Sequence, residues 1–267
     1  MTLAPQQLHG HGPLTTGAEE IVEEIWERLG RVEQRVREAV AARRAVDPDP
    51  DDPYRGQYLT PEGAARILET RDAFTPVPAY EDGAVPDAPT GSRLGRLAEH
   101  FGLAPPDVEL LLVAMAPDID TRFERLYGYL NDDLTRRRPT IGLALELCGL
   151  PAAGSGRFRF APSAPLVAGG LLEIADGERP LLSRTLRVPD RVTAHLLGDD
   201  RTDGRLGGFV QEAAHPREPE ERPEVPRIAA AIGTGSGLVH LLDRGGDPLG
   251  LAVEALAAAG RRPLVVD

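Results

Sequence analysis

The hydrophobic pattern between residues 94 and 197 changes once, from a helical period to a strand-like period, and this change constrains the fold most. Short helices are expected first, over residues 92–101, 105–114, 117–130 and 140–147. Two apolar runs then flank an Asp-Gly turn, at 171–175 and 181–188, which predicts a β-hairpin. A closing helix is expected over residues 189–197.

Several short helices followed by a two-stranded hairpin are typical of a winged-helix domain, and residues 92–198 are predicted to form one. A second interpretation stays open, in which the hairpin only caps a helical bundle. The run Val108–Ala114 is so apolar that it must be almost wholly buried. Because the chain has only 6 Phe, 5 Tyr and 1 Trp, its core must consist mainly of Leu, Val and Ala.

A long amphipathic helix is predicted before this domain, over about residues 18–46. Its apolar positions form a heptad-like stripe with alternating spacings of three and four. The stripe consists of Val22, Ile25, Leu29, Val32, Val36 and Val40. The helix packs either on its own domain or in a coiled coil with a neighbouring subunit, and about two heptads are too few to decide.

The remaining segments are predicted mainly from their prolines and glycines. Residues 1–17 are expected to form a disordered tail, and residues 18–91 the long helix, a short helix and a linker. Thr60 is expected to cap that short helix. Residues 199–236 carry further prolines and are predicted to be a second linker.

The C-terminal residues 237–267 read as a βαβ unit. A strand is expected at 237–242, a helix at 249–259 and a second strand at 263–267. Two strands and one helix cannot close a core. The unit is therefore expected to dock on something else or to open a longer protein. The predicted fold class is α+β: a mostly helical winged-helix-like domain with a long N-terminal helix, followed by this βαβ unit.

The basic residues exclude two kinds of chemistry. All 30 are arginines, so the chain has no lysine for a Walker A phosphate loop or for a Schiff base. The single cysteine, Cys148, excludes a disulfide framework and a cysteine-cluster zinc site.

The charge and the hydropathy limit the partners. A net charge of −12 argues against a general binder of nucleic acid or of anionic membranes. No apolar run approaches the roughly 18 residues of a membrane helix. No signal peptide is recognisable at the N-terminus. A cytoplasmic protein that binds no membrane is the expected default.

Asp118 and Asp120 flank Ile119, and Glu124 follows one helical turn later. One interpretation is a metal or acid–base cluster of carboxylates, although the sequence offers no third converging ligand. The favoured interpretation is that Asp118 or Asp120 caps the helix that follows and complements its dipole.

Arg136, Arg137 and Arg138 form the densest basic run of the chain. In a winged-helix domain such a run can contact phosphate. Three arginines in an acidic chain favour contact with a partner protein or ion pairs within the domain. Thr140 is expected to cap the next helix.

Segments spread over about four fifths of the chain resemble the N-terminal region of a family of large actinobacterial-type AAA ATPases. Some members are encoded beside contractile injection systems. The resembling segments are Asp52–Leu59, Leu110–Asp120, Tyr129–Asp133, Arg138–Leu145, Ala164–Leu166, Gly170–Ile174 and Leu186–Leu197. None of these motifs is catalytic, and the ordered set carries the resemblance.

The resemblance implies a winged-helix-like domain, a linker, a degenerate ATPase domain and then an active one. It places ATP and Mg²⁺ in the parent protein and no cofactor within this chain. In the degenerate domain, Gly245 and Gly246 stand where a phosphate loop would approach a phosphate. The lysine and the Mg²⁺-binding hydroxyl of such a loop are missing, so no catalytic residue is carried over.

The leading hypothesis is a non-catalytic docking region of an AAA-type ATPase, whose parent hydrolyses ATP to remodel proteins or assemblies. The expected partners are the downstream ATPase domains and a protein substrate or adaptor, in a homo-hexameric parent. The long helix and the hairpin would be the contact surfaces. The alternative is a winged-helix DNA-binding module, against which the acidic charge counts.

Overall fold

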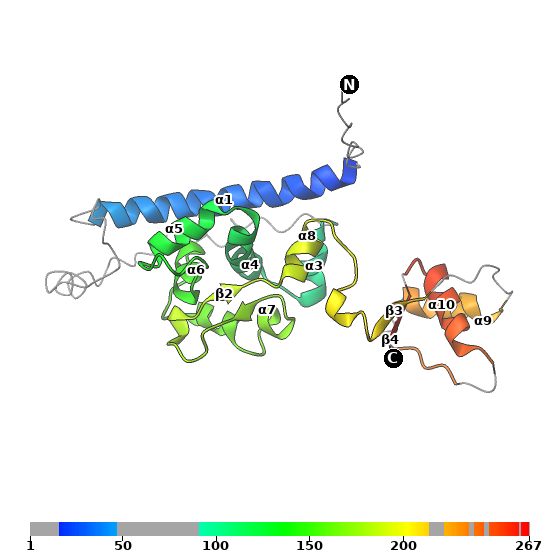
Figure 1. Ribbon diagram of the computed structural model, residues 1–267. Coiled ribbons are helices and arrows are strands. Elements are labelled where there is room, and N and C mark those ends of the chain that lie inside the picture. Colours follow the sequence, from blue (N-terminus) through cyan, green and yellow to red (C-terminus); the bar gives the residue numbers. More distant parts are fainter. Residues whose placement is uncertain are drawn as a thin grey trace, which may run out of the picture. The chain divides into compact units, whose positions relative to one another are not determined.

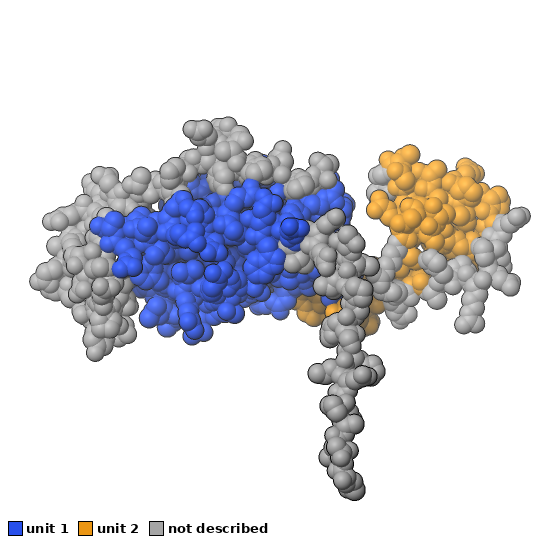
Figure 2. Space-filling view, turned by 90° about the horizontal axis from the view of Figure 1, so that it is seen from above, with its two compact units in different colours: residues 1–200 blue, residues 201–267 orange. Residues whose placement is uncertain are grey.

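The computed structural model describes residues 16–46, 91–213, 222–234, 238–242, 246–261 and 263–266. The chain divides into two compact units, residues 1–200 and 201–267, which Figure 2 shows in different colours. The predicted short helix at Thr60, the linker before residue 91 and nearly all of the predicted tail lie outside the described residues. The domain boundaries drawn from the sequence therefore stay predictions.

Helix α1 (Thr16–Val46) is the long helix that the heptad-like stripe predicts. The stripe residues Ile25, Leu29, Val32 and Val36 are buried in the core of unit 1, and Val40 is partly buried against it. α1 contacts α4 (Pro105–Ile119), α5 (Arg122–Leu130) and α6 (Ile141–Leu147), and Figure 1 shows it lying across these helices. The stripe therefore packs on the helix's own domain.

Ion pairs fasten α1 to each of these three helices. The pairs are Glu33 with Arg122 of α5 at 3.2 Å, Arg35 with Glu109 of α4 at 2.6 Å, and Arg43 with Glu146 of α6 at 2.8 Å. Arg43 also donates to the carbonyl oxygen of Leu130 at 2.7 Å. The Arg35–Glu109 pair is enclosed, since both side chains are at least nine-tenths buried. Removing one partner of an enclosed pair would leave a buried charge without that compensation.

Helix α4 continues through Pro117 to Ile119, so the prediction that a helix begins at Pro117 is wrong. Proline has no N–H, and the carbonyl of Val113, four residues earlier, therefore loses its helical partner. The hydroxyl of Tyr127 in α5 donates to this carbonyl oxygen instead, at 2.9 Å. The sequence pattern favoured proline in a first helical turn. It could not show that a side chain from the next helix satisfies the freed carbonyl.

Helices α3 (Arg93–Phe101) and α8 (Asp190–Leu196) lie against each other in unit 1. The Ser92 hydroxyl caps α3 by accepting the Gly95 N–H at 2.9 Å. Gly102 ends the helix in the left-handed region, with φ 63°. The predicted helices at 92–101 and 189–197 are confirmed.

One ionic cluster joins the start of α3 to the chain after α8. Two Arg93 guanidinium nitrogens each donate to an oxygen of Asp200 at 2.6 Å. His195 Nδ1 lies 2.6 Å from the same carboxylate. Hydrogen bonding from Arg93 is the largest cause that lowers the pKa of Asp200 to about 2, and the hydrogen bond to His195 adds to it.

The hairpin consists of β1 (Glu173–Ile174) and β2 (Leu186–Arg187), paired antiparallel with Ile174 opposite Leu186. Thr140 adds a bridge to Thr185 on the other side of β2, so β1 lies at the edge. The second strand is shorter than the predicted 181–188, because residues 181–183 form the 3₁₀ turn η2 (Leu181–Ser183). Two more elements precede the hairpin, the 3₁₀ helix η1 (Ser155–Phe160) and helix α7 (Pro165–Ala168).

The core of unit 1 is mainly leucine, valine and alanine, as the scarcity of aromatic residues predicts. Every residue of α4 from Asp107 to Pro117 is buried, which confirms the interpretation of the apolar run. Phe123 and Tyr127 supply the aromatic contact of this core, with ring centroids 5.7 Å apart.

In unit 2, helix α9 (Glu224–Gly233) contacts helix α10 (Pro248–Ala258). Strand β3 (Val210–Glu212) pairs antiparallel with strand β4 (Leu264–Val266). A short 3₁₀ turn, η3 (Gly204–Leu206), comes before β3. The predicted helix at 249–259 and strand at 263–267 correspond to α10 and β4. The segment predicted to be a linker, 199–236, contains β3 and α9.

The predicted parallel βαβ unit is wrong in the described residues. Residues 238–242 form no strand, and β4 pairs antiparallel with β3. Leu238 is 88% exposed and Leu242 is 72% exposed, and no strand among the described residues pairs with this apolar run. A strand needs a partner for its backbone groups, and in this unit β3 takes the position beside β4.

Candidate functional site

The loop between α5 and α6 brings the predicted basic run beside the ends of α4 and α5. Each of its arginines pairs with a carboxylate of the same domain. The pairs are Arg136 with Asp133 at 3.0 Å, Arg137 with Glu124 at 3.5 Å and Arg138 with Asp118 at 2.5 Å. The run is therefore engaged in ion pairs within its own domain, one of the uses that the sequence predicts for it.

The Arg138–Asp118 pair is bidentate, with N···O distances of 2.8 and 2.5 Å. Hydrogen bonding to Asp118 is the largest cause that raises the pKa of Arg138. A planar guanidinium matched to both carboxylate oxygens fixes orientation as well as distance. Asp118 thus holds the basic loop against the C-terminal turn of α4.

Asp120 takes the capping role that the sequence predicts for one of the two acids. Its carboxylate accepts the backbone N–H of Arg122, the first residue of α5, at 2.9 Å, and the Arg122 Nε–H at 2.8 Å. These contacts, the side-chain hydrogen bond first, lower the pKa of Asp120. In the part of the chain that the structure describes, no three His, Cys, Asp or Glu side chains gather where they could hold a metal ion.

Asn131 organises this loop, and sequence reasoning did not identify it for that role. Its Nδ2 donates to the carbonyl oxygens of Arg136 and Arg138, at 3.1 and 3.0 Å. Its Oδ1 accepts the Thr140 hydroxyl at 3.0 Å, and Thr140 Oγ1 caps α6 by accepting the Leu143 N–H at 3.2 Å. The predicted Thr140 cap is confirmed, and the backbone that carries the arginines is fixed before any ligand arrives.

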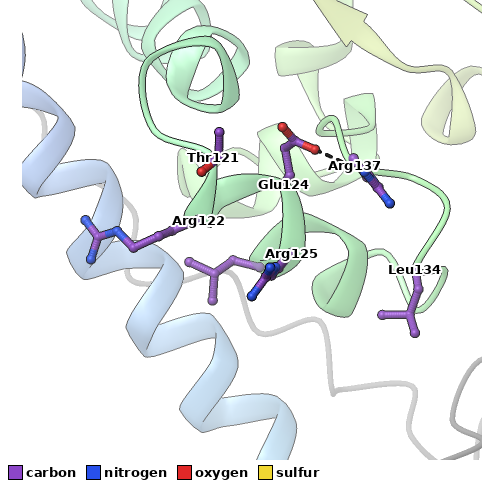
Figure 3. Close-up of a pocket in the computed structure, with 7 residues that line it drawn as sticks. Thr121, Arg122, Glu124, Arg125, Leu134 and Arg137 are labelled. Carbon is purple, nitrogen blue, oxygen red and sulfur yellow. Dashed lines mark hydrogen bonds and ion pairs between the residues drawn. The ribbon is translucent and has the colours of Figure 1, made fainter.

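An open pocket of about 890 Å³ lies along α5, and we call it the α5 pocket. Its lining residues are Thr121, Arg122, Glu124, Arg125, Leu126, Leu134 and Arg137. Figure 3 shows Arg122 reaching toward α1 and Arg137 paired with Glu124. Of these residues, only Arg137 was singled out as an interaction residue from the sequence. Glu124 was named only as part of a carboxylate cluster, and the other lining residues belong to no motif that the sequence analysis recognised.

The α5 pocket offers cationic and apolar contacts together. Three of its lining residues are arginines and one is a glutamate. Leu134 is 64% exposed at its rim. An exposed leucine beside guanidinium groups suits a partner that carries both a carboxylate and an apolar side chain.

Cys148 does not supply a nucleophile to either unit. It is buried, and desolvation is the largest cause that raises the pKa of its thiol to about 12. The thiolate is the reactive form of cysteine, so this side chain stays protonated and inert in the folded chain.

The glycines assigned to a degenerate phosphate loop remain a prediction. Gly245 lies outside the described residues, and Gly246 is exposed just before α10. Asp247 caps α10 by accepting the Gly250 N–H at 2.8 Å, and this backbone hydrogen bond is the largest cause that lowers its pKa. The Asp247 carboxylate therefore occupies the Gly250 N–H. In a nucleotide site, a phosphate would bind to such N–H groups at the helix N-terminus.

Comparison with known families gives a further finding. The family model described as "Winged helix domain, variant" matches residues 22–210, which is more than half of the chain. The matched span includes the buried stripe of α1 and the β1–β2 hairpin. No curated protein and no solved structure matches the chain. Among the described residues, no helix combines the length and apolar content needed to cross a bilayer.

Proposed function

We propose, since the chain belongs to the winged-helix domain family in its variant form, that it docks a protein partner and does not read DNA. The observation that carries this proposal is the pairing of Arg136, Arg137 and Arg138 with carboxylates of their own domain. Positioning on DNA relies on cationic side chains that neutralise phosphates. In a chain of net charge −12, this basic run already neutralises its own acids.

The short helical segments that follow α6 also favour docking of a protein over reading of DNA. In helix-turn-helix proteins the second helix lies in the major groove and presents several side chains to base edges. Here the chain after α6 forms the 3₁₀ helix η1 and then α7, which has four residues. One helical turn is too short to present such a row of side chains.

We further propose that this docking region belongs to an AAA-type ATPase, on the strength of the resemblance described above. ATP and Mg²⁺ would bind in downstream domains, and Gly245 and Gly246 would be a remnant that has lost its lysine. In a homo-hexameric parent, each subunit would present one docking region to the same substrate or adaptor. Several weak contacts would then combine into a strong one.

A peptide selection tests the docking function directly. The full chain is immobilised and panned against a random peptide library, and selected peptides are measured in solution by fluorescence anisotropy. Labelled random-sequence duplex DNA is titrated in parallel over a series of salt concentrations, and Mg-ATP is titrated by calorimetry.

We expect saturable peptide binding, and duplex and Mg-ATP binding no stronger than to a control protein of equal net charge. Duplex binding that weakens steeply with salt, together with no selected peptide, would refute the docking proposal. Turnover of ATP by this chain would refute its non-catalytic part.

A further inference from the structure

A second groove lies between η1 and α7 on one side and the hairpin on the other, with a volume of about 1120 Å³. We call it the wing groove. The residues that matter for its chemistry are Arg157, Phe158, Val167, Ile174, Leu181 and Arg187. Figure 1 shows α7 and β2 on the side of unit 1 away from α1, so the wing groove and the α1 contact are separate surfaces.

Apolar side chains line the wing groove without being covered. Phe158 is 75% exposed, and Val167, Ile174 and Leu181 are half-buried. A large aromatic ring left in water beside branched aliphatic side chains marks a surface that gains free energy when a partner covers it.

The charge of the groove is opposite to that of the chain. Arg157, Arg184 and Arg187 line it against a single acid, Glu173, among the described residues. Arg187 already contacts Asp190 at 3.0 Å and Glu173 at 4.0 Å, and the Nε–H of Arg184 donates to the carbonyl oxygen of Arg179 at 2.9 Å. Each guanidinium has five N–H groups, so both keep donors for a ligand. The structure gives the Arg157 guanidinium no ion pair within the described residues.

The walls of the groove are held in place. Arg159 of η1 donates to Asp107 of α4 at 2.9 Å, and Phe160 is buried. On the opposite wall β1 pairs with β2 on one side, and no other strand of the described residues pairs with it. A free strand edge offers backbone hydrogen bonds to an extended peptide.

From these contacts we infer that the wing groove binds a short, extended, acidic peptide segment of the partner, with an apolar side chain seated against Phe158. The inference rests on the proposed docking function and names the partner's chemistry. The groove exposes one large aromatic ring, Phe158, and carries the acid Glu173. This favours a peptide over single-stranded nucleic acid, whose successive bases stack on several aromatic faces and whose phosphates are repelled by a carboxylate.

Two charge-reversal variants of the full chain test this assignment. Arg157→Glu changes the wing groove, and the matched control Arg96→Glu makes the same charge change at an exposed position of α3 that lines neither the wing groove nor the α5 pocket. A third variant, Phe158→Ser, removes the aromatic contact. Circular dichroism and thermal melting establish that each variant is folded.

We expect peptides selected on the wild-type chain to be enriched in Asp and Glu around one aromatic or aliphatic residue. Arg157→Glu and Phe158→Ser should each weaken their binding by at least about tenfold, because a like charge or a lost anchor replaces a favourable contact. Arg96→Glu should leave the binding constant within about twofold of the wild type, as expected for a charge outside the interface.

Three results would overturn the inference and are distinguishable from a failure of the docking function. Selected peptides without acidic enrichment would contradict the chemistry. Peptides that keep their binding with both Arg157→Glu and Phe158→Ser would place docking outside the wing groove. A single-stranded oligonucleotide that displaces the peptide and binds more tightly would reassign the groove. The docking proposal itself fails only when no peptide is selected.

Discussion

Pro117 and Tyr127 act as a pair, because the hydroxyl of the second satisfies the carbonyl that the first leaves without a helical partner. We expect Tyr127→Phe to destabilise unit 1 by about 1–3 kcal/mol, since the Val113 carbonyl would be buried without a hydrogen bond. The measurement is the free energy of unfolding in urea, followed by circular dichroism.

The companion variant Pro117→Ala restores an N–H that can reach Val113. In that background Tyr127→Phe should cost less than about 1 kcal/mol, and the difference between the two costs is the coupling energy. Equal costs in both backgrounds would show that the tyrosine acts only through packing.

The role of a single residue could be predicted where its side chain interacts with residues close to it in sequence. The caps at Thr140 and Asp120 follow from residue type and position alone. The partners of Arg137 and Arg138 lie 13 and 20 residues away, and local spacing cannot reveal them. Arg125 and Leu134 carry no motif at all, and only the fold places them in one pocket.

At the scale of elements, the enclosed pair between Arg35 and Glu109 ties α1 to α4. We expect Glu109→Ala to cost about 3–5 kcal/mol of unfolding free energy, since it removes the carboxylate from a buried guanidinium. The control Glu33→Ala removes the more exposed partner of Arg122 and should cost at most about 1 kcal/mol.

The Arg35–Glu109 pair can hold α1 in place by charge compensation or by its hydrogen-bond geometry. Replacing both residues separates these two roles. The double variant Arg35→Met with Glu109→Leu should be more stable than Glu109→Ala, because no buried charge remains. Urea unfolding of the three variants gives the comparison. A double variant that is no more stable than Glu109→Ala would show that hydrogen-bond geometry, and not charge compensation, holds α1 in place.

The Asp200 cluster joins α3 to α8 with a defined pH dependence. Its pKa is about 2 in the folded chain, against an ordinary value of 3.8. The folded pKa is the lower one, so the stabilisation is complete above the ordinary value and is lost as the pH falls toward 2.

Asp200→Asn should therefore lower the Tm at neutral pH, and the gap from the wild type should close as the pH falls from 4 toward 2. Thermal melts over this range measure the gap. Glu178→Gln, at an exposed acid of the hairpin turn, is the control and should show no such closing gap. A gap that stays constant with pH would contradict the role of the Asp200 carboxylate.

Helices were easier to predict than the ends of helices and strands. The apolar residues of α1, α3, α6 and α8 repeat with the helical period of 3.6 residues, which is a local pattern. Each of these helices lies close to where that pattern predicts it. The boundary between α4 and α5 was predicted at the wrong residue because proline is favoured in the first turn of a helix. In this chain Pro117 instead lies in the last turn of α4, three residues before the C-cap Asp120. The hairpin was found, but its second strand was too long because the apolar run continues into η2.

At the scale of the whole molecule, the two units differ in how much they bury. Among the described residues, the buried apolar residues of unit 2 are Val253, Ala255 and Pro263, whereas unit 1 has a continuous core. A unit of this size with so small a core is marginally stable.

Hydrogen exchange should therefore show α9 and α10 exchanging much faster than α4, with a separate early transition in urea. Mass spectrometry of the full chain under native conditions measures this. Equal protection of α10 and α4 would mean that unit 2 is stabilised by something other than its own core.

The predicted C-terminal architecture failed for a reason that belongs to this scale. A strand–helix–strand order predicts parallel pairing only when the two strands are each other's neighbours. Here the partner of β4 is β3, which precedes it by about 50 residues in the chain and lies in a segment whose prolines suggested a linker. Pairing between strands so far apart along the chain leaves no pattern in the residues around either strand.

The three ion pairs that fasten α1 also determine how unit 1 would respond to mechanical force. They lie along one helix and contact three different elements. A pull along the axis of α1 loads them together in shear, so that they must break at once. A pull across the axis peels them one after another, at a much lower force. The attachment of α1 to unit 1 would therefore resist a pull along the helix more strongly than a pull across it.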